Sequence, residues 1–349
     1  MKEVDYIIVG QGIAGTMLAN QLLQDNFSIY VIDKFEPNAS SNIATGVVNP
    51  VTGRKMVKSW MIDEVLPFAK KTYRSLESFL QYSFFHDKEI YKVFSSVEDV
   101  QIWNAKRNDS AYANYLGDII STQEANISIE APFGIGIIKN ACWLDVPLMT
   151  KLFRQYLLEK DVLMEAHFDI DLLEISTDIC YKNIKAKGII FCEGYRACNN
   201  PYFNWIPFTL AKGEQLLIHS DDLALTSIVN KNIFLVPKGN AVYSVGSTFI
   251  WNDTTETVTA DGRKEITDKL SKITSASYAI LEEKAGIRPT MRDRRPVIGQ
   301  HPIHLNIFIF NGLGTKGVSL SPYFAQHFSG YLRGINELLQ EISLQRLVE

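Results

Sequence analysis

The chain has 349 residues, of which 46% are hydrophobic and 21% are charged, and its formal net charge at pH 7 is -4. This balance is ordinary for a folded globular protein and gives no electrostatic reason to expect a nucleic-acid or membrane partner, although it does not exclude a local basic patch. The chain has four cysteines without CxxC spacing, no apolar run of about 18 residues and no signal-peptide pattern after Met1, so we expect a cytoplasmic protein with free thiols.

The first segment combines a strand, a glycine-rich turn and a helix. The apolar run YIIV precedes helical apolar spacing over residues 13–23, and a second apolar run, SIYVID, follows. The turn reads G-x-G-x-x-G: Gly10 permits a tight bend, Gly12 leaves room for a pyrophosphate, and Gly15 lets the helix pack on the strand. Asp33 closes the second strand at about the spacing of a carboxylate that binds a ribose hydroxyl. This segment predicts a dinucleotide site and leaves FAD and NAD open.

Further along the chain, the pattern predicts a loop, two helices and a buried strand. Residues 34–60 indicate an extended loop, and a helix is expected from about Pro67 to about Gln81. Residues 88–142 mix short strands and helices that the pattern does not resolve. Residues 146–160 predict an amphipathic helix, and the run GIIFCEG predicts a buried strand that ends in glycine.

The C-terminal half favours a second, β-rich domain. Residues 205–250 alternate as antiparallel strands do, and the end of the chain returns to strand, glycine turn and helix. We therefore predict the α/β class, as a two-domain α+β protein with a Rossmann-like nucleotide-binding domain and an interleaved antiparallel β-sheet substrate domain. The predicted nucleotide-binding segments are 1–85, 145–200 and 285–349, and the predicted substrate-domain segments are 86–144 and 201–284.

Five segments, in this order, carry a resemblance to a known family. They are VGQGIAGTMLA…VIDK, SSNIATGVVNP, GIIFCEGY, AKGEQLLI and AGIRPTMRDRRPVIGQHP…IFIFNGLGTKGVSLSPYFA. On these segments the chain resembles the D-amino acid oxidase superfamily of flavoenzymes, which includes glycine and sarcosine oxidases and D-amino acid dehydrogenases. The resemblance implies FAD as the cofactor. No cysteine follows Arg288, so the covalent flavin–cysteine link of the sarcosine oxidases is not supported and the FAD is expected to be noncovalent.

The resemblance also implies which residues contact FAD. Glu193 stands where many members have a small residue, and Phe168 is expected to contact adenine through its backbone, with core packing as the alternative. The expected FAD-contacting residues are Gly10, Gly12, Ile13, Ala14, Gly15, Asp33, Lys34, Ser41, Asn42, Thr45, Gly46, Val47, Val48, Phe168, Cys192, Glu193, Gly194, Tyr195, Arg288, Gly312, Leu313, Gly314, Thr315, Lys316 and Gly317.

Two basic residues are the candidates for catalytic roles. Arg288, in GIRP, matches the family's anchor for the substrate carboxylate, and a guanidinium can bind a carboxylate through two parallel hydrogen bonds. Lys316, in GLGTKG, is expected near the flavin pyrimidine edge, where positive charge stabilises the reduced ring. The alternatives are a surface arginine and a solvated loop lysine. Further substrate-binding candidates are Phe234, Tyr243, Phe249 and Arg54, with core packing or a solvated loop as their alternatives.

The resemblance implies an FAD-dependent oxidoreductase that oxidises the C–N bond of a small amino acid or N-substituted glycine. Hydride would pass to flavin N5, and the imine would hydrolyse in water. Two alternatives stay open: flavin-dependent trimming of a carboxymethylamino group on a tRNA wobble uridine, and a non-catalytic FAD-binding protein. No metal site is expected, because His301 and His304 lack further ligands at suitable spacing. A small-molecule partner and no membrane partner are expected.

Overall fold

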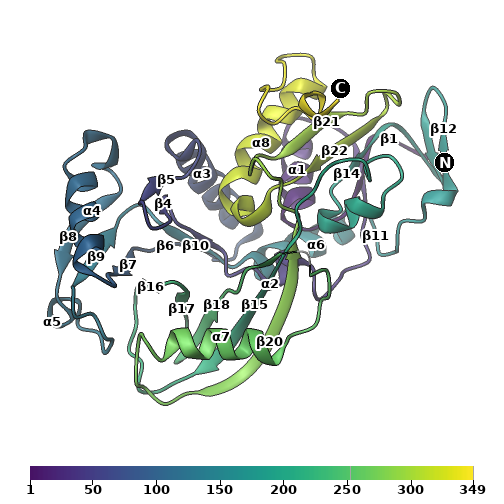
Figure 1. The fold of residues 1–349 in the computed structure, drawn as a ribbon. Coiled ribbons are helices and arrows are strands. Elements are labelled where there is room, and N and C mark those ends of the chain that lie inside the picture. The colour runs from purple at the N-terminus through teal and green to yellow at the C-terminus, as the bar shows by residue number, and fades with distance from the viewer. Residues whose placement is uncertain (252, 349) are drawn as a thin grey trace.

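The computed structural model describes residues 1–251 and 253–348, and Figure 1 shows their fold. A mixed sheet at the N-terminal end of the molecule has the order β11-β2-β1-β14-β13-β12, with β22 beside β14 and β21 beside β22. Its strands are β1 (Lys2–Val9), β2 (Ile29–Ile32), β11 (Leu163–Met164), β12 (Leu173–Ile175), β13 (Ile179–Tyr181), β14 (Ile184–Phe191), β21 (Val297–Gln300) and β22 (Ile307–Asn311).

The centre of this sheet is parallel and buried because its strands are nearly continuous apolar runs. Ile8 of β1 pairs with Ile190 of β14, and both side chains are fully buried. Helices α1 (Ile13–Gln24) and α8 (Gly317–Leu332) contact each other beside the sheet. Leu18 of α1 and Phe324 of α8 belong to the same hydrophobic cluster as Ile8 and Ile190. Both ends of the chain therefore contribute to this sheet and its hydrophobic cluster.

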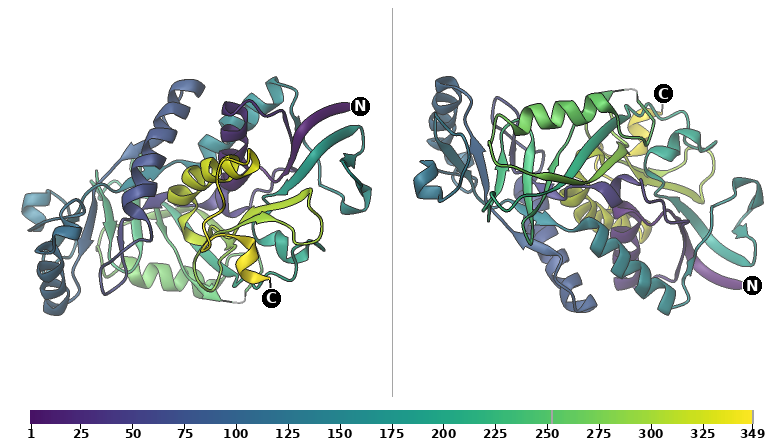
Figure 2. Two further views of the ribbon diagram at one scale, coloured as in Figure 1. Left: turned by 90° about the horizontal axis from the view of Figure 1, so that it is seen from above. Right: turned by 90° about the horizontal axis from the view of Figure 1, so that it is seen from below.

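A second sheet carries the antiparallel strands. Its order is β19-β15-β18-β17-β16-β7-β9-β8, with β20 on the other side of β15. Helix α7 (Ala260–Leu270) covers one face through Ile266 and Leu270, which cluster with Ile218 and Val245, and Figure 2 shows α7 lying across the strands. The strands are β7 (Ile90–Val93), β8 (Leu116–Ile120), β9 (Ile135–Ile138), β15 (Ala211–His219), β16 (Ile228–Asn230), β17 (Phe234–Gly239), β18 (Val242–Gly246), β19 (Ile250–Trp251) and β20 (Ala279–Arg288).

Smaller elements connect the two sheets. A short sheet has the order β3-β10-β6, and β4 pairs with β5. Their bounds are β3 (Val47–Val48), β4 (Val51–Thr52), β5 (Val57–Lys58), β6 (Phe85–Asp87) and β10 (Cys142–Leu144). The remaining helices are α2 (Ser40–Ile43), α3 (Ile62–Leu80), α4 (Val97–Arg107), α5 (Thr122–Ala125) and α6 (Val146–Glu159). In Figure 1, α4 lies at one end of an elongated molecule and the N-terminus at the other.

Most predicted elements are confirmed, with one boundary clearly wrong. The opening strand–helix–strand, the helix from Val146 and the antiparallel strands of residues 205–250 are present. Helix α3, however, begins at Ile62, and Pro67 lies inside it instead of in its first turn, because Asp63 and Glu64 occupy that turn and favour the earlier start. The division into two domains stays a prediction, and β20 runs across the predicted boundary at 285.

Three further observations concern membrane spans, metal sites and disulfides. Within the described residues, no helix is both long and apolar enough to cross a bilayer. The same residues bring together no group of three His, Cys, Asp or Glu side chains that is placed to hold a metal ion. All four cysteines are free thiols.

Candidate active site

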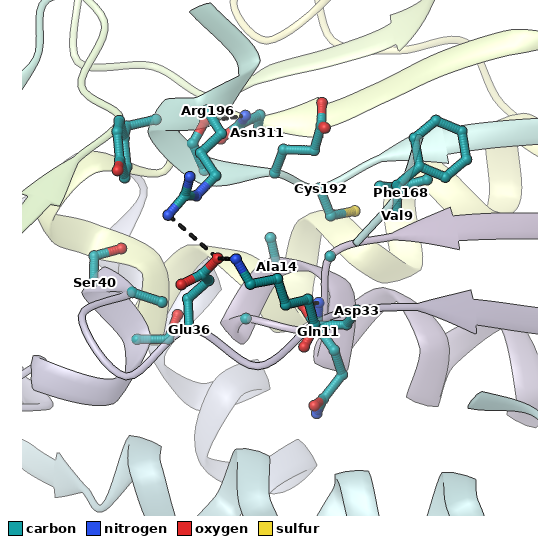
Figure 3. A pocket seen from close by; sticks show the side chains of 18 of the residues that line it. Val9, Gln11, Ala14, Asp33, Glu36, Ser40, Phe168, Cys192, Arg196 and Asn311 are labelled. Atoms are coloured by element: carbon teal, nitrogen blue, oxygen red, sulfur yellow. Dashed lines mark hydrogen bonds and ion pairs between the residues drawn. The ribbon is translucent and has the colours of Figure 1, made fainter. Parts of the chain in front are cut away.

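A cavity of about 440 Å³ lies at the carboxyl ends of β1, β2 and β14, beside the N-terminus of α1 (Figure 3). Sixteen of the predicted FAD-contacting residues are in its wall: Gly10, Gly12, Ile13, Ala14, Asp33, Lys34, Ser41, Asn42, Phe168, Cys192, Glu193, Gly194, Tyr195, Leu313, Gly314 and Gly317. Segments far apart in the sequence therefore meet around one cavity, at the edge of a parallel sheet where ligands usually bind.

The glycine turn has the geometry that close approach of a ligand requires. Gly10 has φ +97°, and a Cβ there would lie 2.6 Å from the Cys192 carbonyl oxygen. A Cβ at Gly15 would overlap the Gly10 carbonyl oxygen, so Gly15 supports the turn without lining the cavity. Helix α1 has no side-chain cap at Gly12 and no acidic residue in its first turn. Its first N–H, of Ile13, donates to Ser41 Oγ at 2.9 Å. The rest of its positive end is open to an anionic group, which fits a pyrophosphate.

Asp33 lies in the cavity wall, but its carboxylate is already bound by the protein. Oδ1 accepts a hydrogen bond from the Gln11 backbone N–H at 2.9 Å, and Oδ2 accepts from Arg154 Nη1 at 2.7 Å and from the Phe35 N–H at 2.8 Å. Arg154 is buried, comes from α6 and also pairs with Glu165 at 3.0 Å. The structure thus gives Asp33 a role in holding the turn, through an arginine that the sequence pattern did not single out.

Acidic side chains lie in or beside the same cavity. Glu193 accepts a hydrogen bond from Asn200 Nδ2 at 2.7 Å, and burial raises the pKa of Glu193 to about 7. Figure 3 shows Arg196 reaching Glu36, and the closest atoms of this ion pair are 3.4 Å apart. Arg196 also approaches Glu256 at 3.6 Å, so one arginine joins the β2–α2 loop to a loop of the second sheet across the cavity.

Arg288, the last residue of β20, is half-buried, and it hydrogen-bonds to no carboxylate among the described residues. Nη2 donates to Ser247 Oγ at 2.5 Å, Nη1 lies 3.4 Å from the Thr248 carbonyl oxygen, and the guanidinium carbon is 5.1 Å from the centre of the Phe249 ring. Among the described residues, no Asp or Glu forms an ion pair with Arg288. Burial lowers the pKa of Arg288 to about 10, so the guanidinium is charged at neutral pH. A Cβ at Gly213 would overlap this guanidinium, which therefore needs the glycine.

A family model described as FAD dependent oxidoreductase, DAO, matches residues 5–330 of this chain. The chain belongs to this family. A stretch of 118 residues is 30% identical to the glycine oxidase of Bacillus subtilis (strain 168), but the match spans only 33% of this chain and 32% of that protein. The crystal structure of glycine oxidase from Geobacillus kaustophilus superposes with a TM-score of 0.82 at 15% identity, over 97% of both chains. That of iminodiacetate oxidase from Chelativorans sp. BNC1 gives 0.75 at 18% identity, over 96% of this chain and 97% of that one. These structures show the fold, and the family makes FAD the cofactor.

The residues around the cavity fit FAD at both ends. At one end the ring of Phe168 lines the cavity and stacks on Tyr181, with ring centres 4.6 Å apart. At the other end Thr290 Oγ1 is buried and has no hydrogen-bond partner among the described residues, and a Cβ at Gly314 would lie 3.2 Å from it. Gly314 has φ +51°. A buried hydroxyl without a partner beside a glycine in the cavity wall is suited to the polar edge of a bound ring.

Other residues expected at FAD lie just outside the cavity wall. Gly46 has φ +77°, and a Cβ there would overlap the Leu144 carbonyl oxygen. Lys316 Nζ donates to Ser59 Oγ at 2.8 Å, and burial, with Arg294 nearby, lowers the pKa of Lys316 to about 8. These outer residues are Gly15, Thr45, Gly46, Val47, Val48, Arg288, Gly312, Thr315 and Lys316. Their contact with FAD stays a proposal.

The four further substrate candidates fall in three places. Phe249 lies against Arg288. Phe234 is on the same face of the second sheet as Arg288. Arg288 pairs with Ala211, which shares a face with Gln215 four residues on, and Gln215 pairs through Gly246 with Phe234. The expectation for Tyr243 needs correction: its side chain points to the opposite face, is buried in the cluster under α7, and its hydroxyl donates to the Leu223 carbonyl oxygen. The alternation of side chains along β18 imposes this. Arg54 is in the wall of a separate cavity.

Proposed function

We propose that this protein oxidises the C–N bond of a small carboxylated amine, an amino acid or an N-substituted glycine, and that Arg288 binds the carboxylate. The observation that carries the proposal is the charged, largely desolvated guanidinium of the half-buried Arg288, which pairs with no acidic side chain in the described part of the chain. An unpaired buried charge is costly, and a substrate carboxylate would compensate it through two parallel hydrogen bonds. Glycine and iminodiacetate, in the names of two similar proteins, are both carboxylated amines.

The residues around Arg288 give it a fixed orientation. Ser247 and Thr248 accept its hydrogen bonds on one side and Phe249 lies against it, so a bound carboxylate would hold the amine and its Cα in one position. When bound, FAD would supply the acceptor for the hydride that the substrate carbon loses. The imine product then hydrolyses in water and needs no acid–base residue of the protein.

Lys316 and the N-terminus of α8 supply the positive charge that this chemistry needs. Lys316 directly precedes α8, whose first residue, Gly317, lines the cavity. With a pKa near 8 the Lys316 ammonium is mostly protonated at neutral pH. We place this charge and the positive end of the helix dipole at the flavin edge that gains electron density.

The test is anaerobic titration of the FAD-loaded protein with a panel of amino acids and N-alkyl glycines, followed by flavin absorbance. We expect one class of these amines to bleach the flavin. Arg288→Ala should retain FAD and lose roughly a hundredfold in kcat/KM for carboxylated substrates, because a bidentate charged contact disappears. The control is Arg292→Ala, since Arg292 is exposed and four residues away.

Two outcomes would contradict the proposal. If Arg288→Ala and Arg292→Ala have the same kinetics, Arg288 does not anchor the carboxylate. If no amine in the panel bleaches the flavin, a small substrate is excluded, and the tRNA and non-catalytic alternatives replace it.

A further inference from the structure

A second cavity, of about 210 Å³, lies between the β4–β5 hairpin and the end of the second sheet that is remote from Arg288. In Figure 1 this hairpin lies near β7 and β16. The wall residues come from the hairpin and the residue Asn49 before it, from the strands β7, β9 and β16, from the turn after β16, and from α4. They are Asn49, Val51, Gly53, Arg54, Met56, Lys92, Trp103, Ile138, Asn230 and Asn232. None of these residues lines the FAD cavity.

The polar part of this wall is cationic and amide-bearing. Its described residues include Arg54, Lys92 and three asparagines, and none of them is acidic. Lys92 Nζ has one hydrogen bond, to Asn230 Oδ1 at 3.3 Å, and within residues 1–251 and 253–348 neither Lys92 nor Arg54 forms an ion pair. Burial lowers the pKa of Lys92, with Asp99 opposing the shift from a distance. A partly buried ammonium with only a long amide contact is the donor that a desolvated anion would use.

Sheet register places this cavity on the same face of the second sheet as Arg288. Phe234 pairs with Asn230, and Asn230 pairs with Lys92, so the three side chains form a row across β17, β16 and β7. Phe234 shares this face with Arg288. Adjacent strands are about 4.8 Å apart, which puts Lys92 roughly 10 Å from Phe234.

A glycine beside Lys92 leaves room for the Trp103 ring, which forms one wall of this cavity. Gly136 pairs with Lys92 across β7 and β9, and a Cβ at Gly136 would lie 2.7 Å from the ring of Trp103. The buried Trp103 ring therefore packs over Gly136 and forms an apolar wall beside the Lys92 ammonium. The polar floor and apolar wall together are typical of a small-molecule site.

We propose that this second cavity is an oxyanion-binding site, for a small molecule that carries a phosphate or a carboxylate. Lys92 and Arg54 bind the oxyanion, and the amides of Asn230 and Asn232 donate further hydrogen bonds. The site is separate from Arg288 and does not rest on the amine-oxidising function proposed above.

The test uses the FAD-loaded protein, so that the N-terminus of α1 is already occupied by the cofactor. Inorganic phosphate, and separately succinate, is titrated by calorimetry, with sodium chloride holding the ionic strength constant. We expect saturable binding of at least one of the two anions. Lys92→Met and Arg54→Ala should each raise its Kd by about tenfold or more, which is the loss of one charge-assisted hydrogen bond.

The matched control is Lys88→Met, because Lys88 is a partly exposed lysine near the start of β7 whose Nζ bonds only to the Thr226 carbonyl oxygen among the described residues. This variant should bind the anion as the parent protein does. Arg54 is also exposed, so Arg54→Ala tests the site even where Lys92→Met unfolds the protein. The proposal is overturned if neither anion binds saturably, or if Arg54→Ala keeps the parent Kd.

Discussion

Gly213→Ala tests the Arg288 site without removing its charge. The guanidinium lies over Gly213, where a new Cβ would stand 2.5 Å from Nη1 and closer still to Nη2 and Cζ. Ordinary van der Waals contact begins near 3.4 Å, so the guanidinium must move by about 1 Å or more. It can move because it is the far end of a flexible side chain, and the fold should therefore tolerate the substitution.

The expected loss is kinetic. A displacement of about 1 Å at a positioning group costs on the order of a hundredfold in rate, and the lost charged contact is worth about 1.5–3 kcal/mol, which is roughly ten- to 150-fold. We expect kcat/KM for the best carboxylated amine to fall within this range, measured by flavin reduction in stopped flow. FAD content and the thermal unfolding midpoint should be close to those of the parent protein.

A double-mutant cycle with Arg288→Ala gives the refuting result. Both substitutions remove the same contact, so the double variant should be no worse than Arg288→Ala alone. If Gly213→Ala has the parent kcat/KM, the guanidinium does not act from the position over Gly213. If the two losses simply multiply, the glycine acts through something other than Arg288.

Two further predictions concern pH and stability. Glu193 faces the FAD cavity with a pKa near 7, so it is neutral below pH 7 and ionised above it. The ionised form repels the FAD phosphates, and the Kd for FAD should therefore rise above pH 7, by up to about tenfold per pH unit, while in Glu193→Gln this rise should disappear. Titration of apoprotein with FAD, followed by fluorescence, measures both, and an equal rise in Glu193→Gln would refute the assignment. Lys212 is fully buried and pairs with Asp253 at 2.9 Å and Glu214 at 3.2 Å. Lys212→Met should lower the free energy of unfolding by about 3–5 kcal/mol, because it leaves the buried carboxylate of Glu214 without its cation. Lys185→Met, which removes an exposed pair with Asp178, should leave the denaturation midpoint nearly unchanged, and similar midpoints for the two variants would contradict this reasoning.

The sequence predicted best those helices, strands and turns that are determined by interactions between residues close together in the chain. The run of residues 6–15 specifies strand, turn and helix because apolar periodicity and glycine conformation act within a few residues. The helix from Val146 and the antiparallel strands have equally clear periodicity. Residues 88–142 resisted prediction because their short strands are stabilised by partners far away, such as β16 for β7.

Long-range contacts also explain why sequence patterns missed one site residue and could not say which way two others point. Arg154 looks like any arginine on a helix, yet it reaches Asp33, 121 positions earlier. Tyr243 and Phe234 both stand in alternating strands, and only the pairing of β18 with β15 and β17 shows that they point to opposite faces. Register depends on the whole sheet, and a shift of one residue would exchange the two faces.

By itself, the sequence determined that a dinucleotide turn opens the chain and, through five ordered segments, which flavoenzyme family it resembles. The tertiary structure decided which charged groups are paired and which are free to bind a ligand. Asp33 is held by Arg154, whereas Arg288 and Lys92 have no carboxylate partner among the described residues. Pairing of this kind is a property of distances between remote segments, and those distances exist only once the sheets have formed.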